Sequence, residues 1–327
     1  MFFYRPYHTT DKKLLHELYN KNVIHDGFYK ELSYQEFDEN LFSHPEFDRS
    51  GCYICISHNQ IIGFIECFIR KIDTSDSSKP GYISTILVDY NYRKKGIGTH
   101  LLKLATSYIK SRGHNQLMIS YEGTMNWPWY IEGTNKHDHA GAPGLLLDSD
   151  FMMFFKKMGF RVDDTLDAFH LNLSEFKPQE RVKQDLEKAK KDGITIELYD
   201  KEKHTGLHEF YLDINRECFI RVIENNLKLP KPYPFAVIVK DNKIMGWTGA
   251  FYTEASGRAH FDGIIISEKV RKRGLGRALF SYLAEYSYAH GSTYMSFFTQ
   301  RDNIARNIYL GLGFKIVKTF QTLKKEI

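Results

Sequence analysis

A glycine-rich segment flanked by cations is the part of this sequence best suited to chemistry. It lies between a β-rich run and a helix-favouring run. Glycines there permit turn conformations closed to other residues and let a ligand approach the backbone closely. The free N–H groups of the new helix carry the positive end of its dipole, so such a turn binds phosphate groups. We therefore predict a phosphate-binding loop formed by Arg271, Lys272, Arg273, Gly274, Leu275, Gly276 and Arg277. The third glycine of a dinucleotide fingerprint and the Gly-Lys-Ser/Thr of a Walker loop are both missing.

A second motif follows this loop downstream. It reads Asn303-Ile-Ala305-Arg306-Asn-Ile-Tyr309-Leu-Gly-Leu-Gly313-Phe314. The two motifs together, in this order and spacing, resemble those of the GNAT acetyltransferase superfamily. That resemblance implies that the loop holds the pyrophosphate of acetyl-CoA as co-substrate. It also implies that the later helix, with Asn303 and Arg306, flanks the pantetheine arm and the sulfur. Asn303 is equally suited to capping that helix, because Asp302-Asn303 is a good helix start.

The resemblance implies that an amine attacks the acyl thioester directly and that CoA thiolate leaves. Tyr309 lies where the family places a proton donor for the thiolate, and a phenol is protonated at neutral pH. The family's oxyanion donors are backbone N–H groups of the strand before the loop. Here Ile266 is the expected donor, and Ile264 lies on the same strand. The base that deprotonates the amine stays open among Asp262, His260 and Glu254.

The elements that carry these motifs occur twice, as an internal repeat. Asn59-Gln60-Ile61-Ile62-Gly63-Phe64 reappears as Asn242-Lys243-Ile244-Met245-Gly246-Trp247, and Arg93-Lys94-Lys95-Gly96-Ile97-Gly98 reappears as the loop above. Each copy predicts an early amphipathic helix (11–23 and 205–221), strands, the glycine turn, a helix, a strand and a last helix. A β-rich run before each turn is expected at 82–88 and 260–267. The fold class is therefore α/β, in the α+β arrangement that the GNAT resemblance implies: two tandem domains, each with a mixed, mostly antiparallel sheet flanked by helices.

The expected domains are 1–177, which is degenerate, and 194–327, which is catalytic. Residues 178–193 form a charged linker helix between them. The first copy keeps Arg93, Gly96 and Gly98, which leaves open whether it binds CoA. It has Phe155 where Tyr309 stands, and phenylalanine cannot donate a proton. It also carries an insertion at 122–148, which either covers the thioester pocket or packs against the other domain.

Composition limits the class of protein. The chain has 327 residues, 42% of them hydrophobic, with 24 Phe and 21 Tyr, which is typical of packed globular domains. A net charge of +5 is too mild to indicate a nucleic-acid partner, and no apolar run is long enough for a membrane span. Cys52 and Cys55 fall on a predicted strand, where they point to opposite faces and cannot easily share a metal ion. We expect a cytoplasmic protein without a metal site, and a homodimer is one possible state.

The function expected from the sequence is N-acetyl transfer from acetyl-CoA to the primary amine of a small molecule in the second domain. Two alternatives stay open. One is a CoA-binding sensor or interaction protein without turnover, and the other is a protein or peptide N-acetyltransferase. The acceptor itself is not encoded in any motif, because acceptor pockets are built from variable helices and loops.

Overall fold

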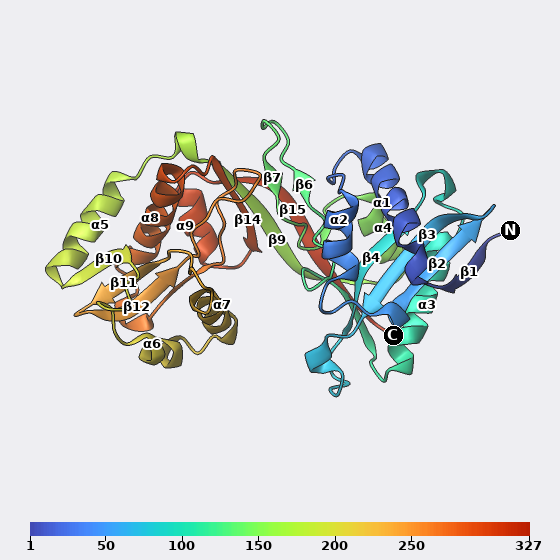
Figure 1. The fold of residues 1–327 in the computed structure, drawn as a ribbon, viewed down its shortest axis with the longest axis horizontal. Coiled ribbons are helices and arrows are strands. Elements are labelled where there is room, and N and C mark those ends of the chain that lie inside the picture. The colour runs from blue at the N-terminus through green and yellow to red at the C-terminus, as the bar shows by residue number, and fades with distance from the viewer. The chain divides into compact units, whose positions relative to one another are not determined.

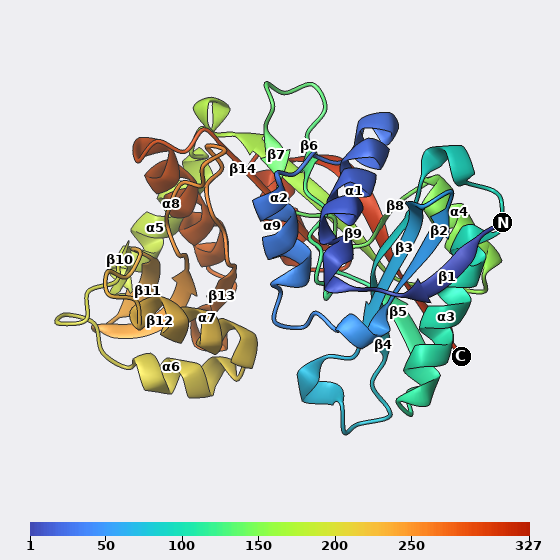
Figure 2. The same ribbon diagram turned by 45° about the vertical axis from the view of Figure 1, so that its right-hand side comes forward.

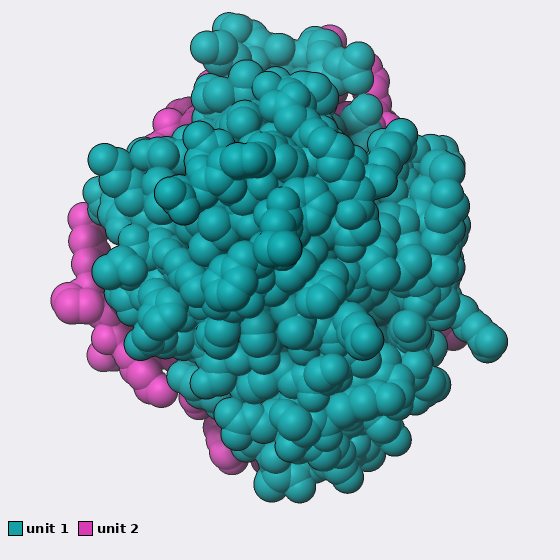
Figure 3. All heavy atoms as spheres, turned by 90° about the vertical axis from the view of Figure 1, so that its right-hand side faces the viewer, with its two compact units in different colours: residues 1–167, 318–327 teal, residues 168–317 magenta.

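The computed structural model describes residues 1–327, which form two compact units. Unit 1 comprises residues 1–167 and 318–327, and unit 2 comprises residues 168–317 (Figure 3). This division differs from the expected boundary at 178–193. The chain leaves unit 1 within strand β9 (Arg161–Asn172) and returns to it within strand β15 (Lys315–Glu326). Neither change of unit coincides with a loop, and for this reason no composition shift marks either one.

Unit 1 is built on a mixed sheet with the order β1-β2-β3-β4-β5-β15. Neighbouring strands are antiparallel except β4 and β5, which are parallel. Its strands, besides β9 and β15, are β1 (Phe3–Pro6), β2 (Cys52–Ser57), β3 (Gln60–Phe68), β4 (Gly81–Val88), β5 (Gln116–Ile119), β6 (Trp129–Tyr130), β7 (Asp138–His139) and β8 (Leu145–Leu146). Its helices are α1 (Lys12–Asp26), α2 (Tyr34–Phe37), α3 (Ile97–Ser111) and α4 (Asp150–Lys157) (Figure 1).

Two hydrophobic cores flank the unit 1 sheet. One contains apolar residues of α3 and α4, and the other contains apolar residues of α1 and α2. Cys55 belongs to the first core and Cys52 to the second, so the two thiols face opposite sides of β2, as their spacing predicted. Burial raises the pKa of both thiols.

Unit 2 repeats this plan with a second sheet, β10-β11-β12-β13. Its strands are β10 (Ile194–Leu198), β11 (Ala236–Lys240), β12 (Lys243–Thr248), β13 (Ile264–Ile266) and β14 (Tyr294–Gln300), and its helices are α5 (Glu180–Lys191), α6 (Leu207–Ile214), α7 (Glu217–Leu227), α8 (Leu275–Ala289) and α9 (Ala305–Gly311) (Figure 2). The repeated order confirms the tandem α+β fold. No helix in either unit combines the length and the apolar character needed to cross a bilayer.

Two expected elements of unit 2 take a different form. The single helix expected over 205–221 is divided into α6 and α7, because Asn215 adopts a left-handed backbone (φ 43°) that ends α6. The strand expected over 260–267 is regular only at Ile264–Ile266, since Gly263 just before it has a φ of 136°.

The strand before each glycine loop separates from its next neighbour. In unit 1, β4 pairs with β5 only at Gly81 and Tyr82. In unit 2, the Ala259 N–H donates to the Tyr294 carbonyl (2.8 Å), but β14 pairs with β9 rather than with β13. The later part of β4 and all of β13 therefore have one edge without a strand partner, and their backbone groups on that edge are left for another partner.

The ends of β9 and β15 complete the cores of the units that they enter. Phe169 and Leu171 of β9 belong to the core of unit 2, and Leu323 of β15 belongs to a core of unit 1. Helix α5 was expected as a linker, and the helix does form over that segment. It packs against α8 and β10 within unit 2 (Figure 1), because Val182 and Ala189 bury themselves there.

Candidate active site

The first arginine of each glycine loop ties the loop to the strand before it. Arg93 Nε donates to the Val88 carbonyl (3.2 Å), and Arg271 Nε donates to the Ile266 carbonyl (3.0 Å). Each guanidinium also meets a carboxylate, Asp26 in unit 1 and Glu268 in unit 2. In this structure both arginines therefore shape the turn, and phosphate binding is left to the other groups of the loop.

The glycines of the two loops have matching geometry. Gly96 and Gly274 precede α3 and α8 with left-handed φ angles of 82° and 73°, a conformation that favours glycine. Gly98 and Gly276 are the second residues of the two helices and have no such φ. A Cβ on Gly98 would lie 3.4 Å from the Phe154 ring of α4, and one on Gly276 would lie 3.1 Å from Ile308 of α9. In both units the turn is thus confined by the last helix of the copy.

Unit 1 has a cavity of about 320 Å³ at its loop, which is within the range of small-molecule sites. It lies between the end of β4, the loop and α4. Lys94 and Lys157 contribute cations to the lining, Asp150 contributes a carboxylate, and the ring of Phe154 contributes an apolar wall. A Cβ on Gly96 would meet nothing within 4 Å. The lining therefore suits a ligand that combines phosphates with an apolar arm, as CoA does.

The loop of unit 2 has a different neighbour. Arg273 forms an ion pair with Asp192, and Arg277 Nη1 lies 4.0 Å from the Asp185 carboxylate. Asp185 lies on α5, and Asp192 ends it. Lys272 makes no ion pair and has a left-handed backbone with φ 63°. Three of the four cations in the predicted loop, Arg271, Arg273 and Arg277, thus already face carboxylates.

Tyr309 lies on α9 and is 4% exposed, within a cluster of aromatic rings. The rings of Phe297 and Phe280 have their centroids 4.7 and 5.0 Å from its own. Its hydroxyl has no hydrogen-bond partner, and burial raises its pKa to about 12. The group is therefore protonated at neutral pH and free to donate.

The candidate bases of unit 2 form one connected cluster. His260 contacts Glu254 through Nδ1 (3.1 Å) and Asp262 through Nε2 (2.8 Å). Burial opposes a charge on His260, but the two carboxylates outweigh burial and raise its pKa to about 9. The histidine is thus an imidazolium at neutral pH and cannot accept a proton. Asp262 also accepts from the Ala250 N–H (3.1 Å), and Arg258 pairs with Glu254.

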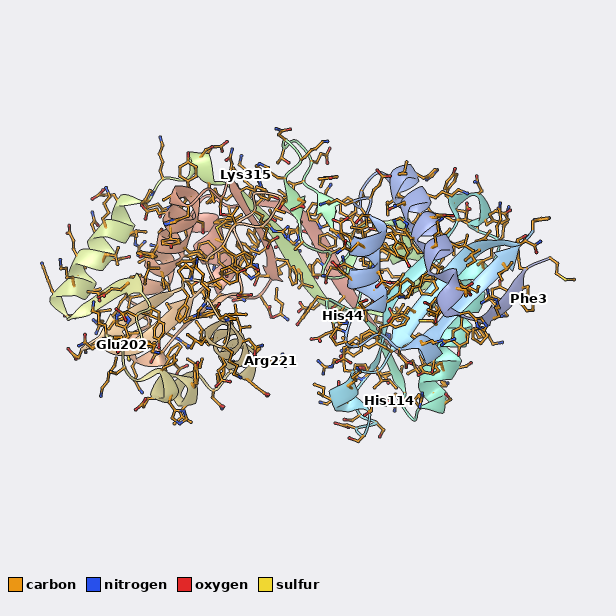
Figure 4. The ribbon with its side chains drawn as sticks, viewed as in Figure 1. Phe3, His44, His114, Glu202, Arg221 and Lys315 are labelled. Atoms are coloured by element: carbon orange, nitrogen blue, oxygen red, sulfur yellow. The ribbon has the colours of Figure 1, made fainter.

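An aromatic stack extends from this cluster. The Tyr252 ring lies 4.1 Å from the His260 ring, and the Tyr233 ring lies 4.4 Å from Tyr252. The segment that carries Tyr233 is held by Asn226 of α7, whose side chain bonds both the N–H and the carbonyl of Tyr233. Arg221 lies on the same helix (Figure 4). The sequence placed Tyr233 in a proline-rich segment (229–234) expected to help build the acceptor pocket, but it did not single out Tyr252.

The remaining predicted residues of unit 2 have distinct places. Ile264 and Ile266 belong to β13 and pack against the core that contains Tyr309. Leu275 is a core residue, 2% exposed, so its side chain does not line a site. Asn303 accepts from the Ala305 N–H (2.9 Å) and donates to Thr299 (2.9 Å), so its side chain is engaged just before α9, whose N-cap is Ile304. Arg306 lies on α9 and is half-buried.

In unit 1, the insertion at 122–148 covers β4 at the position that corresponds to Asp262. Thr124 bonds Glu66 of β3 (2.8 Å) and Ser84 of β4 (2.8 Å), and the Trp127 indole donates to the Ser84 carbonyl (3.1 Å). Burial raises the pKa of Glu66 to about 8, although Thr124 and Ser84 offset part of the effect. The insertion thus covers β4 at Ser84, and Phe155, 1% exposed, takes the place of Tyr309.

Several site features had little or no sequence signal. Asp185 and Asp192 are seven residues apart, a spacing that puts both on one face of a helix, but nothing local shows which surface that face meets. The place of Phe154 and Lys157 in the cavity of unit 1 follows from the position of α4, the last helix of that copy. Glu66 was not distinguishable from an ordinary strand residue.

Comparison with known proteins agrees with this geometry. The model of the acetyltransferase (GNAT) family matches residues 15–126 and again residues 195–314. An uncharacterized N-acetyltransferase of Methanocaldococcus jannaschii is 33% identical over 66 residues, which span 20% of this chain and 29% of that relative. The chain belongs to the GNAT family of acetyltransferases and contains two copies of its domain.

Solved structures share the whole two-copy arrangement. A tandem GNAT protein from the clavulanic acid biosynthesis pathway superposes with a TM-score of 0.64 at 13% identity, covering 100% of this chain and 98% of that one. A GCN5-related N-acetyltransferase from Sphaerobacter thermophilus superposes with a TM-score of 0.65 at 16% identity, covering 99% of this chain and 95% of that one. A GCN5-related glucosamine N-acetyltransferase region of a fungal multi-domain GH3 β-N-acetylglucosaminidase superposes with a TM-score of 0.74 at 15% identity. The match covers 99% of this chain and 38% of that one. At these identities the likeness concerns the fold.

Proposed function

We propose that this protein transfers an acetyl group from acetyl-CoA to the primary amine of a small molecule, and that unit 2 performs the chemistry. The observation that carries the proposal is the Tyr309 hydroxyl, which is protonated and has no hydrogen-bond partner. Ile264 and Ile266, from the strand with an unpaired edge, pack against the same core. A proton donor and backbone N–H groups are what thioester aminolysis needs.

The residues of unit 2 support a balanced sequence of steps. The amine nitrogen forms a bond to the thioester carbon, and N–H groups on the free edge of β13 stabilise the oxyanion. The oxyanion then re-forms the carbonyl as the carbon–sulfur bond breaks, the leaving thiolate takes the proton of the Tyr309 hydroxyl, and the resulting phenolate regains a proton from water before the next turnover. The proton lost by the amine passes to the Asp262 carboxylate, directly or through water. His260, held as an imidazolium, positions that carboxylate.

A different role suits unit 1. Its cavity and open loop support CoA binding, whereas the buried Phe155 and the insertion over β4 argue against turnover there. A CoA-binding unit without chemistry is therefore our second candidate for this copy. It would give the chain two cofactor sites and one acyl-transfer site.

Calorimetric titration of CoA into matched variants tests both assignments. Gly98→Val and Gly276→Val introduce the same side chain at corresponding positions, and neither position has a left-handed φ. We expect Gly276→Val to abolish turnover and Gly98→Val to remove a binding site while turnover persists. Turnover lost only with Gly98→Val would transfer the reaction to unit 1. A wild-type protein that binds no CoA would exclude the enzyme proposal.

An acceptor panel addresses the substrate class. Glucosamine is the first amine to test, because a structurally similar region is described as a glucosamine N-acetyltransferase. The stack of Tyr233, Tyr252 and His260 next to Asp262 offers a flat aromatic surface and a carboxylate. Simple alkyl amines, and a peptide with a free N-terminus and a lysine, complete the panel. Acetylation of the peptide alone would replace the small-molecule proposal with protein or peptide acetylation.

A further inference from the structure

The loop of unit 2 is covered by a side chain from α5. A Cβ placed on Gly274 would collide with the Asp185 side chain, whose carboxylate lies directly against this glycine. The absence of a side chain at Gly274 thus allows α5 to approach α8 closely. The Asp185 carboxylate therefore occupies the space through which a phosphate would approach the backbone of Gly274.

The loop cations are engaged by the same helix. Asp192, at the end of α5, forms an ion pair with Arg273, and Asp185 lies 4.0 Å from Arg277 Nη1. Arg277 Nε is buried without a hydrogen-bond partner. Two carboxylates of α5 therefore meet the loop and its cations, where an anionic ligand would otherwise bind.

Unit 1 lacks such a helix, and its matching glycine is open. In unit 2, α5 precedes β10 and packs against α8, and no helix of unit 1 places a side chain against Gly96 in this way. A Cβ on Gly96 would meet nothing within 4 Å, and the cavity of unit 1 reaches its loop. The two copies have the same loop motif, so α5 accounts for the difference between them.

Few buried groups hold α5 in place. Only Val182 and Ala189 of its residues are buried, and most of its other side chains are charged and exposed. A short helix with so little buried apolar surface is a low-stability element that can open locally. The carboxylates can therefore withdraw from the loop without unfolding of the unit 2 core.

We propose that α5 is a built-in competitor for CoA, with Asp185 and Asp192 in place of the pyrophosphate at the loop of unit 2. CoA must displace these carboxylates to bind, so the second copy has a lower affinity than its motif implies. The inference rests on the proposed function only in placing a CoA site at this loop, and its test reads binding rather than turnover. A protein that binds CoA but shows no turnover would therefore contradict the enzyme proposal and leave this inference intact.

The test is a CoA titration of the full chain carrying Asp185→Asn and Asp192→Asn. These replacements keep the side-chain shape and remove two negative charges at the loop. We expect the dissociation constant of unit 2 to fall at least tenfold, with that of unit 1 unchanged. Amide exchange at the first turns of α3 and α8 assigns each binding event to its unit.

Glu180→Gln with Glu187→Gln is the matched control, because it removes the same charge from exposed positions of α5. We expect this control to change the affinity less than twofold. An equal gain in both double variants would show a general charge effect and overturn the proposal. An unchanged or weaker affinity in the Asp185→Asn, Asp192→Asn variant would also overturn it.

A second measurement uses the wild-type chain and so does not depend on the folding of a variant. When CoA protects the first turn of α8, the amides of α5 are expected to exchange faster with solvent. Unchanged or slower exchange in α5 under that condition would show that CoA and the helix bind together, and would overturn the competition.

Discussion

Tyr309 combines two properties that one tyrosine seldom has, deep burial among aromatic rings and a hydroxyl without a partner. Tyr309→Phe removes only that hydroxyl. We expect turnover to fall by roughly 10²–10⁴-fold, the usual contribution of a general acid, with CoA affinity within about twofold of wild type. Steady-state kinetics and calorimetry measure the two quantities. Tyr294→Phe, which deletes a buried hydroxyl bonded to Ser256 in the same unit, is the control and should leave turnover unchanged.

His260 gives unit 2 a pH-dependent stability. Its folded pKa of about 9 exceeds the ordinary value of 6.5, so its ion pairs stabilise the fold fully below pH 6.5. That contribution is lost as the pH rises through 9. His260→Asn should therefore lower the free energy of unfolding at pH 6 and have little effect near pH 10.

Denaturant unfolding of wild type and variant across this range measures the difference. His208→Asn, at an exposed position of α6 without an ion pair, is the control. A difference between wild type and His260→Asn that stayed constant with pH would show that the histidine acts through packing rather than charge.

At the scale of elements, Glu66 joins β3 to β4 and to the insertion of unit 1. Its folded pKa of about 8 exceeds the ordinary 4.5, so the unfolded chain releases its proton first and stability falls as the pH rises from 4.5 to 8. We expect Glu66→Gln to stabilise unit 1 at pH 8 and to have almost no effect near pH 4. Unfolding curves at the two pH values measure this. A variant destabilised at pH 8 would show that the Glu66 carboxylate is needed by Thr124 and Ser84.

The elements added to each unit explain why the two copies of the loop motif have different surroundings. In unit 1, the insertion covers β4 at Ser84 and leaves the loop open; in unit 2, α5 covers the loop and Tyr309 keeps its free hydroxyl. Under the proposed function, each copy is thus obstructed at a different end of the path that CoA would take. For this reason we assign chemistry to unit 2 and unopposed CoA binding to unit 1.

At the scale of the whole molecule, the last strand of the chain returns to the first unit. Lys315 begins β15 within unit 2 (Figure 4), and Leu323 is fully buried in a core of unit 1. We expect Leu323→Ala to destabilise the fold by about 2–5 kcal/mol and to speed amide exchange within residues 1–167. Leu279→Ala, an equally buried change in the core of unit 2, should act on residues 168–317 instead. Faster exchange in unit 2 for both variants would contradict the strand return.

The sequence by itself determined the repeat, the fold class and the family, because these rest on short motifs whose turns, caps and helix faces are set by neighbouring residues. Arg271, Gly274 and Gly276 lie at a strand–helix turn as expected, and Tyr309 lies on the last helix. The roles in catalysis stay predictions until the variants are measured. Asn303 shows the limit of local inference, since it suited two roles and in the structure its side chain bonds Ala305 and Thr299 while Ile304 is the N-cap of α9.

Tertiary structure decided the unit boundaries, the closure of the first copy and the covering of the second loop. Strands β9 and β15 each pass from one unit to the other without a turn, so no breaker residue marks the change. Asp185 reaches Gly274 across 89 residues, and Thr124 reaches Glu66 across 58. Contacts at such separations depend on how whole elements pack, and the spacing of residues along the chain does not encode them.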